Sequence, residues 1–170
     1  MKPLSILSLI PLVLALGCAH EPEQFFVLQK EATLFFEAHG DSISELADTL
    51  EADDAIQSLE CTKGMGIQLP SKAISRVDGS TVELTREQVQ KYRGLVKAAH
   101  VCDGGAVRGG IVFDLFETSG PTERQVIQLL RVSRDGDQLC ARDRELFDGD
   151  WCVVPLSDGW QLAYSWSVIW

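Results

Sequence analysis

Residues 160–170 read WQLAYSWSVIW, and the rest of the chain must be organised around this closing stretch. Apolar and mostly large side chains occupy every even position, whereas the odd positions are smaller or more polar on the whole. A period of two sends alternate side chains to opposite faces of a β-strand. The stretch therefore predicts a strand that carries three Trp and one Tyr on one face. Other elements must cover that face, because burying apolar surface contributes roughly 25 cal/mol per Å².

The residues before this strand also have the pattern of β structure. Apolar runs occupy residues 110–117, 124–134, 137–142 and 151–157. The turns between them fall at 119–122, Asp135-Gly136, Asp148-Gly149 and Asp158-Gly159. Asp-Gly pairs between such runs are typical of tight turns. With the closing strand, the pattern predicts five strands in a consecutive antiparallel meander.

The N-terminal half of the chain has helical periodicity instead. Apolar residues three and four apart predict a helix over residues 21–39, which ends at Gly40. Ser42 with Glu45 has the spacing of a capping box and predicts the start of a second helix. The apolar face of that helix extends to Ile56 and Leu59.

A hairpin and a third helix are predicted next. Asp78-Gly79 separates residues 73–77 from residues 80–84 and favours a type I′ turn. Thr85 with Gln88 forms another capping box, and the helix that it opens has four inward apolar residues: Val89, Tyr92, Val96 and Ala99.

These elements predict a single α+β domain over residues 18–170, in the order α-α-ββ-α and then the meander. We expect the helices to pack on one face of a twisted antiparallel sheet. This order resembles the NTF2-like cone, and that resemblance implies a pocket enclosed between the helices and the sheet. A likeness at the level of the fold does not by itself assign a function.

The first seventeen residues have the features of an export signal. Lys2 precedes an apolar run over residues 4–16, which is too short for an ordinary transmembrane helix. The run ends in Leu14-Ala15-Leu16-Gly17-Cys18, which resembles the lipobox of bacterial lipoproteins. The resemblance implies cleavage after residue 17 and palmitate-type acylation of Cys18. Ala19, instead of Asp, follows the cysteine, and in such lipoproteins this implies that the lipid anchors the protein in the outer membrane with the domain facing the periplasm. The alternative is plain secretion with an odd thiol at Cys18.

Four cysteines remain after this processing, and in an exported chain an even number indicates two disulfides. Three pairings are possible. We favour Cys140–Cys152, which would close a loop over residues 143–150, and therefore Cys61–Cys102. C-x-x-C spacing is absent and the three histidines, His20, His39 and His100, do not cluster in sequence, so we expect neither a metal nor a cofactor.

The chain carries a formal charge of −10, which becomes −11 without the signal because Lys2 is lost and no acid is. Nucleic acid and anionic lipid surfaces are therefore poor partners, since phosphate binding needs clustered Lys and Arg. A basic protein is compatible with the charge. The candidate partner-binding residues are the acids of the second predicted helix and of the 143–150 loop: Asp48, Glu51, Asp53, Asp54, Glu145 and Asp148. The alternative is that these acids form a solvated surface.

No P-loop, dinucleotide-binding or zinc-protease motif occurs in the sequence, so we expect a protein that is not an enzyme. Gly40-Asp41-Ser42 resembles the nucleophile block of GDSL esterases, but no histidine follows His100 to supply the C-terminal base. The leading hypothesis is a periplasmic lipoprotein that binds a protein, most concretely an immunity or inhibitor protein against a secreted toxin. One alternative is an accessory, pilotin-like lipoprotein of an envelope machine. The other is an NTF2-like domain that binds a small ligand beside Trp160, Tyr164 and Trp166.

Overall fold

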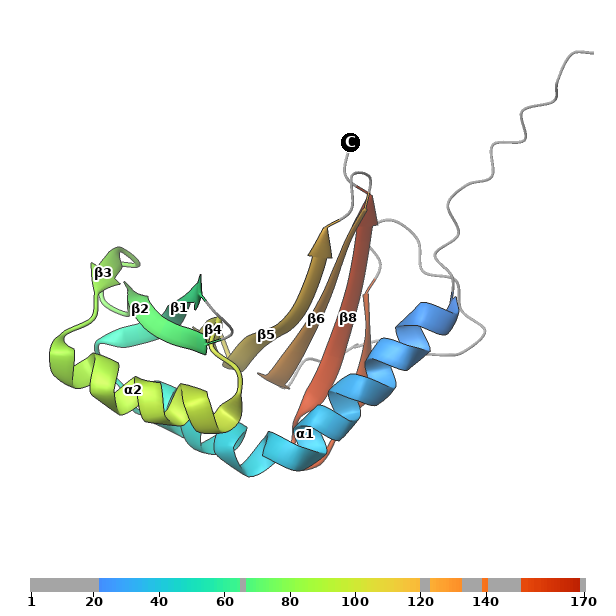
Figure 1. The fold of residues 1–170 in the computed structure, drawn as a ribbon, viewed down its shortest axis with the longest axis horizontal. Coiled ribbons are helices and arrows are strands. Elements are labelled where there is room, and N and C mark those ends of the chain that lie inside the picture. Colours follow the sequence, from blue (N-terminus) through green and yellow to red (C-terminus); the bar gives the residue numbers. More distant parts are fainter. Residues whose placement is uncertain (1–21, 65–66, 120–122, 133–138, 141–150, 169–170) are drawn as a thin grey trace, which may run out of the picture.

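The computed structural model describes residues 22–64, 67–119, 123–132, 139–140 and 151–168 (Figure 1). Within these ranges two helices cover one face of an eight-stranded antiparallel sheet, with strand order β3-β2-β1-β4-β5-β6-β8-β7. The elements are α1 (Pro22–Glu51), β1 (Ile56–Gly64), β2 (Ile67–Ser75), β3 (Thr81–Glu83), α2 (Arg86–Ala99), β4 (Gly104–Val107), β5 (Gly110–Ser119), β6 (Glu123–Val132), β7 (Trp151–Pro155) and β8 (Gln161–Val168). The α+β class predicted from the sequence is confirmed. The proposed signal peptide and Cys18 lie outside the described residues.

One long helix replaces the two that the sequence predicts over residues 21–59. α1 continues through Gly40 and ends at Glu51, and Figure 1 shows that it bends partway along its length. A glycine inside a helix costs only about 1 kcal/mol relative to alanine, which tertiary packing can offset. At Gly40 the missing Cβ makes room for a ring, because a Cβ would lie 3.2 Å from Cζ of Phe36. The residues buried along α1 form one continuous stripe: Ala32, Phe36, Ile43, Leu46, Ala47 and Leu50.

β1 occupies residues that the sequence assigned to a helix. Ile56 and Leu59 are both buried in the core, and their spacing of three imitates a helical period. In the strand, a shift of register between Ile56 and Ser58 marks a β-bulge. A bulge inserts one extra residue, so two residues three apart return to the same face of the sheet. The helical prediction was wrong here because a bulged strand and a helix give the same local spacing.

The hairpin and the last helix agree with the sequence. β2 and β3 pair across the predicted turn, with Ala73 opposite Val82. The turn is longer than the expected type I′ turn, and of Asp78 and Gly79 only the glycine has a positive φ, 70°. In α2, both hydrogen bonds of the Thr85–Gln88 capping box are present, and Tyr92, Val96 and Ala99 are buried.

The C-terminal strands are not a consecutive meander. β8 lies between β6 and β7, so β7 forms an edge of the sheet although it precedes β8 in the chain. β7 is short and ends at Pro155, which has no N–H to donate and is tolerated at an edge. Of the strand predicted over residues 137–142, only Leu139 and Cys140 are described, and Leu139 forms a parallel bridge to Val153. The aromatic closing strand takes the inner position, where it pairs on both sides beneath α1.

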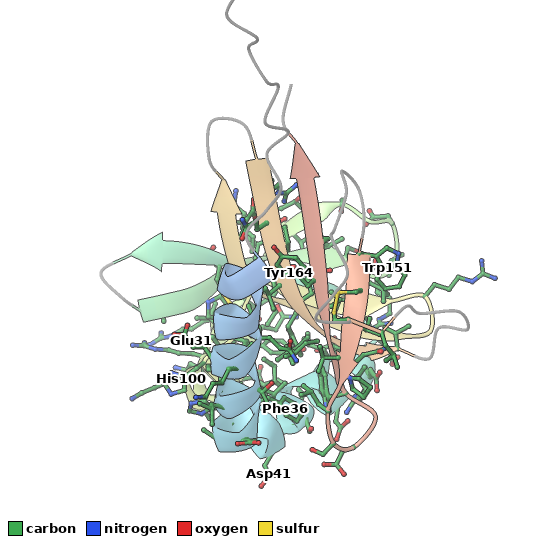
Figure 2. The ribbon with its side chains drawn as sticks, turned by 90° about the vertical axis from the view of Figure 1, so that its right-hand side faces the viewer. Glu31, Phe36, Asp41, His100, Trp151 and Tyr164 are labelled. Atoms are coloured by element: carbon green, nitrogen blue, oxygen red, sulfur yellow. A yellow bond between two sulfur atoms is a disulfide. The ribbon has the colours of Figure 1, made fainter. Side chains whose placement is uncertain are left out.

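The core lies between α1, α2 and the inner face of the sheet. Trp160, Leu162 and Tyr164 belong to it, as the alternation of the closing stretch predicts, and Trp160 is only 2% exposed. The Trp160 ring packs against Phe36 of α1, at 5.9 Å between centroids, and against Phe113 of β5, at 6.2 Å. Figure 2 shows Phe36 of α1 and Tyr164 of β8 among the side chains that lie between the helix and the strands. The side chain of Trp166 and all of Trp170 lie outside what the structure describes.

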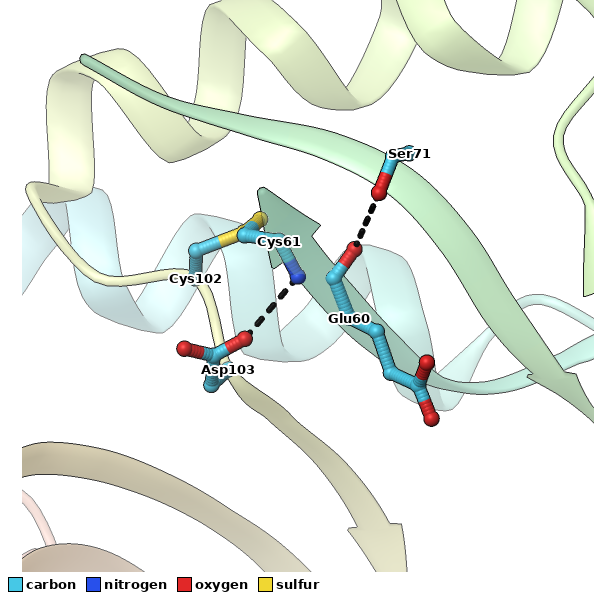
Figure 3. Close-up of a disulfide and its surroundings, with 5 residues drawn as sticks. All are labelled: Glu60, Cys61, Ser71, Cys102 and Asp103. Atoms are coloured by element: carbon cyan, nitrogen blue, oxygen red, sulfur yellow. Dashed lines mark hydrogen bonds between the residues drawn. A yellow bond between two sulfur atoms is a disulfide. The ribbon is translucent and has the colours of Figure 1, made fainter. Parts of the chain in front are cut away.

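Both predicted disulfides are present. Cys61 of β1 is bonded to Cys102, which follows α2, with their Cα atoms 6.0 Å apart (Figure 3). Cys140 is bonded to Cys152 of β7, with their Cα atoms 4.9 Å apart. The first disulfide joins a strand to the end of α2, because residues 56–64 form β1. Among the described residues, neither helix has the length and apolar character that crossing a membrane requires.

Candidate functional site

The acidic residues predicted to bind a partner do not share one helix face. Asp48 and Glu51 lie near the C-terminal end of α1, whereas Asp53 and Asp54 lie in the turn that follows it. Glu145 and Asp148 fall outside the described residues. The four acids of the α1 end have different surroundings, so their roles have to be considered one by one.

Arg131 of β6 neutralises part of the charge of α1. Its Nη1 lies 2.8 Å from Oδ1 of Asp48, and its Nη2 lies 2.9 Å from Oε2 of Glu51. The guanidinium also lies over the Trp160 ring, 5.3 Å from the centroid. The Arg131 side chain is 21% exposed, whereas that of Asp48 is 70% exposed. Arg131 therefore holds both carboxylates against the sheet. Sequence reasoning missed it, because no local pattern shows which β6 residue meets α1.

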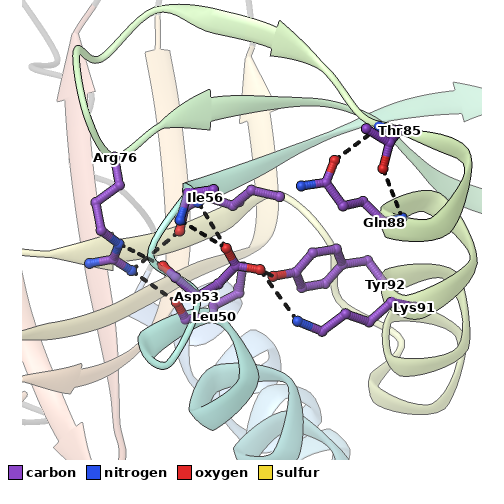
Figure 4. Close-up of polar contacts among 9 residues, drawn as sticks. Leu50, Asp53, Ile56, Arg76, Thr85, Gln88, Lys91 and Tyr92 are labelled. Carbon is purple, nitrogen blue, oxygen red and sulfur yellow. Dashed lines mark hydrogen bonds and ion pairs between the residues drawn. The ribbon is translucent and has the colours of Figure 1, made fainter.

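Asp53 is a structural acceptor rather than a free acid (Figure 4). Its Oδ1 accepts the N–H groups of Ala55 and Ile56 at 3.0 and 3.1 Å. Its Oδ2 accepts the Tyr92 hydroxyl at 2.6 Å and the Lys91 ammonium at 3.3 Å. Burial alone would raise the pKa of Asp53, but hydrogen bonds from Tyr92, the two backbone N–H groups and Lys91 outweigh it, and the pKa falls below its ordinary value. Asp53 thus joins the end of α1 to β1 and α2.

Arg76 completes this junction from the turn between β2 and β3. α1 has no basic residue in its last turn, where carbonyl oxygens lack intrahelical partners. Arg76 supplies the missing donors: Nη2 donates to the Leu50 carbonyl at 2.8 Å, and Nε donates to the Asp53 carbonyl at 2.9 Å. A positive charge at this position also interacts favourably with the helix dipole. Of the four acids near the α1 end, only Asp54 is exposed without a polar partner among the described residues.

The remaining acidic surface of α1 borders a shallow hollow between α1 and α2. The hollow has a volume of about 590 Å³ and is open to solvent. We call it the α1–α2 hollow, and its lining residues are Asp41, Ser44, Glu45, Asp48, Thr49, Ala52 and Lys91. Asp41 and Glu45 have no hydrogen-bond or ion-pair partner among the described residues, and Asp41 lies at the lower end of the molecule in Figure 2. Ser44 accepts a hydrogen bond from Nε1 of Trp160 at 3.1 Å, which joins the hollow to the core.

A second hollow of about 360 Å³ lies along β1, β4, β5 and β6. Its carboxylates come from Glu60, Asp103 and Asp114, and Asp114 accepts a hydrogen bond from Gln128 at 2.7 Å. Asp103 is already engaged, because its Oδ1 accepts the Cys61 N–H at 2.9 Å (Figure 3). Asp103 and the sulfurs of Cys61 and Cys102 lie within 4.8 Å of one another, but the two sulfurs are bonded to each other. The two sulfurs are therefore engaged in the disulfide, and the Asp103 carboxylate in its hydrogen bond with Cys61.

The residues considered for chemistry have structural surroundings. Trp160 and Tyr164, named for a ligand pocket, are buried in the core. Ser42 lies inside α1, so the segment that resembles an esterase nucleophile block is the interior of a helix. His39 and His100 come together although 61 positions separate them, with ring centroids 4.5 Å apart. Sequence reasoning did not connect these two residues.

Comparison with known proteins gives no further guidance. No protein family, no curated protein and no solved structure matches this chain. The functional reading therefore depends on the described residues and their surroundings.

Proposed function

We propose that this protein is a non-catalytic lipoprotein that binds a basic protein partner at the α1–α2 hollow. In the most concrete form it is an immunity or inhibitor protein that neutralises a secreted toxin in the periplasm. An N-terminal lipid on Cys18 would hold it at the outer membrane. The lipobox-like sequence before Cys18 and the net charge of −10 support this proposal.

The observation that carries the proposal is the pair of unpartnered carboxylates at the rim of the hollow. Asp41 and Glu45 are one helical turn apart on α1, and both are exposed. Asp48 continues the row and is oriented by Arg131. Exposed carboxylates attract basic surfaces and accelerate their association. The helix fixes the backbone positions of these residues, so their spacing is set before a partner binds.

The shape of the hollow favours a protein over a small molecule. Small-ligand sites are usually concave, mostly apolar and able to bury most of the ligand. The α1–α2 hollow is open and bordered by charged side chains. An NTF2-like ligand pocket has less support, since Trp160 and Tyr164 pack into the core. The pilotin-like alternative would use the same kind of surface, so the identity of the partner separates it from the inhibitor hypothesis.

The test is a crosslinked pull-down of the tagged protein from native envelopes, read by mass spectrometry. We expect one basic secreted protein to be captured by the wild type, and its recovery to fall with rising salt. Asp41→Lys/Glu45→Lys should lose it. Glu60→Lys/Glu83→Lys is the matched control, because it changes the net charge equally at two other exposed positions. Cys18→Ser should release the protein from the membrane if Cys18 is acylated.

Each outcome has a distinct meaning. Capture of secretion or assembly components would favour the pilotin-like alternative. Equal capture by the wild type and Asp41→Lys/Glu45→Lys would exclude the α1–α2 hollow as the binding surface. If no protein is recovered specifically, the binding hypothesis fails, whatever the behaviour of Cys18→Ser.

A further inference from the structure

His39 and His100 meet at the surface where α1 and α2 approach each other. Their rings are 4.5 Å apart between centroids and inclined by 46°. His100 is exposed and His39 is half-buried, so solvent reaches the pair. Figure 2 shows His100 beside α1. We infer that His39 and His100 together form a binding site for a divalent first-row transition-metal ion, with Cu²⁺ bound most tightly.

The conformation of His100 brings its ring to this position. His100 caps α2 in the left-handed conformation, with φ 56° and ψ 18°, and its N–H donates to the Val96 carbonyl. Glycine or asparagine usually occupies this place at a helix end, because a Cβ is disfavoured there. The chain has a histidine instead, and the ring extends toward α1. On the other element, Phe35 packs against His39 with centroids 4.9 Å apart and restricts its ring.

The ring separation fits one ion shared by two imidazoles. A ring nitrogen lies about 1.1 Å from the centroid and binds a first-row metal at about 2.0–2.1 Å, which places the ion about 3.2 Å from each centroid. Centroids 4.5 Å apart then subtend about 90° at the ion. Tetrahedral coordination would need centroids about 5.2 Å apart. The cis angle of about 90° is that of square-planar and octahedral complexes, which Cu²⁺ and Ni²⁺ prefer.

The ring nitrogens are not engaged by other polar groups of the described residues. Neither imidazole has a hydrogen-bond or ion-pair partner among the described residues, so no such bond has to break. In the described ranges no third side chain completes a ligand group with these histidines, and water would fill the other positions. Imidazole suits Cu²⁺, Ni²⁺ and Zn²⁺, whereas Mg²⁺ and Ca²⁺ prefer oxygen ligands. Among these ions the Irving–Williams order puts Cu²⁺ first.

The experiment is a Cu²⁺ titration of the full chain, followed by calorimetry and by electron paramagnetic resonance at pH 7.5. All samples carry Cys18→Ser and His20→Ala, which remove another thiol and imidazole near the N-terminus. We expect one saturable site whose spectrum has hyperfine coupling to two imidazole nitrogens. Asparagine is compatible with the left-handed conformation at position 100, so His100→Asn preserves the cap of α2. His100→Asn and His39→Ala should each weaken Cu²⁺ binding by about tenfold or more.

Two controls separate this site from adventitious binding. Asp54→Asn, which changes an exposed carboxylate outside α1 and the α1–α2 hollow, should leave Cu²⁺ affinity unchanged, and excess Mg²⁺ should not compete. Circular dichroism and Trp fluorescence establish that each variant is folded. The inference is overturned by the absence of saturable binding, by unchanged affinity in both histidine variants, or by loss of binding in the carboxylate variant.

Discussion

Replacing Asp53 with alanine should destabilise the protein strongly, because one carboxylate holds three elements together. The substitution removes the acceptor for two backbone N–H groups, the Tyr92 hydroxyl and the Lys91 ammonium. Hydrogen bonds to a charged group contribute about 1.5–3 kcal/mol each when buried, and exposed ion pairs about 0–1 kcal/mol. The Asp53 side chain is 14% exposed. The bonds from the Ile56 N–H and the Tyr92 hydroxyl are part-buried, whereas those from Ala55 and Lys91 are exposed. At about 1.5 kcal/mol for each part-buried bond and about 0–1 kcal/mol for the exposed bonds together, we expect a loss of about 3–4 kcal/mol in the free energy of unfolding.

Urea unfolding followed by Trp fluorescence at pH 7 measures this loss. Asp54→Ala is the matched control, because the adjacent carboxylate is exposed and unpartnered among the described residues, and it should change stability by less than about 0.5 kcal/mol. Tyr92→Phe removes one of the four bonds and should cost about 1–2 kcal/mol. The reasoning is refuted if Asp53→Ala and Asp54→Ala unfold at the same urea concentration.

The effect should also depend on pH in one direction. The pKa of Asp53 is lower in the folded protein than its ordinary value of 3.8. The carboxylate therefore stabilises the fold above pH 3.8, and this contribution is lost as pH falls through the folded pKa. We expect the stability difference between wild type and Asp53→Ala to be full at pH 6 and smaller at pH 3. A difference that grows on acidification would contradict the assignment.

Three further perturbations test the core, the sheet and a disulfide by the same unfolding assay. Trp160→Ala should cost about 3–5 kcal/mol, since it empties a buried aromatic site and leaves Ser44 without its donor. Gly104→Ala should cost more than about 3 kcal/mol, because φ is 146° and a Cβ would lie 2.2 Å from the Val112 carbonyl oxygen. The control Gly94→Ala in α2, where a Cβ meets no atom within 4 Å, should stabilise the protein by about 0.5–1 kcal/mol. Loss of the Cys61–Cys102 disulfide, which closes a loop of 41 positions, should cost about 4 kcal/mol; a cost near zero would mean that other contacts already hold β1 to the end of α2.

Local patterns predicted some elements because the physical cause lies within a few residues. The capping box of Thr85 and Gln88 involves groups three positions apart, and it opens α2 as expected. Gly79 supplies a positive φ in the β2–β3 turn. The same local reasoning failed at Gly40 and at Ile56–Leu59. There the outcome depended on Phe36 packing against the glycine and on a bulge set by the pairing of β1 with β2.

At the candidate site, too, local sequence patterns predicted some features and long-range contacts set the others. Acidic residues near the end of α1 are visible in the sequence, but their different roles are not. Asp53 accepts bonds from α2, Asp48 pairs with Arg131 of β6, and only some carboxylates remain exposed without partners. These contacts join residues 38 to 83 positions apart in the sequence, and a local sequence period cannot predict contacts over such separations.

The α+β class, the buried face of the closing strand and the presence of two disulfides among four cysteines could be predicted from the sequence, whereas the structure showed that the favoured one of three possible pairings is present. Alternation, capping and cysteine number are local or compositional properties, so they can be read without coordinates. Tertiary contacts were needed to show that α1 is continuous, that β8 lies between β6 and β7, and that the rings of His39 and His100 meet. Each of these depends on which distant surfaces bury one another, and burial is a property of the whole chain rather than of any segment.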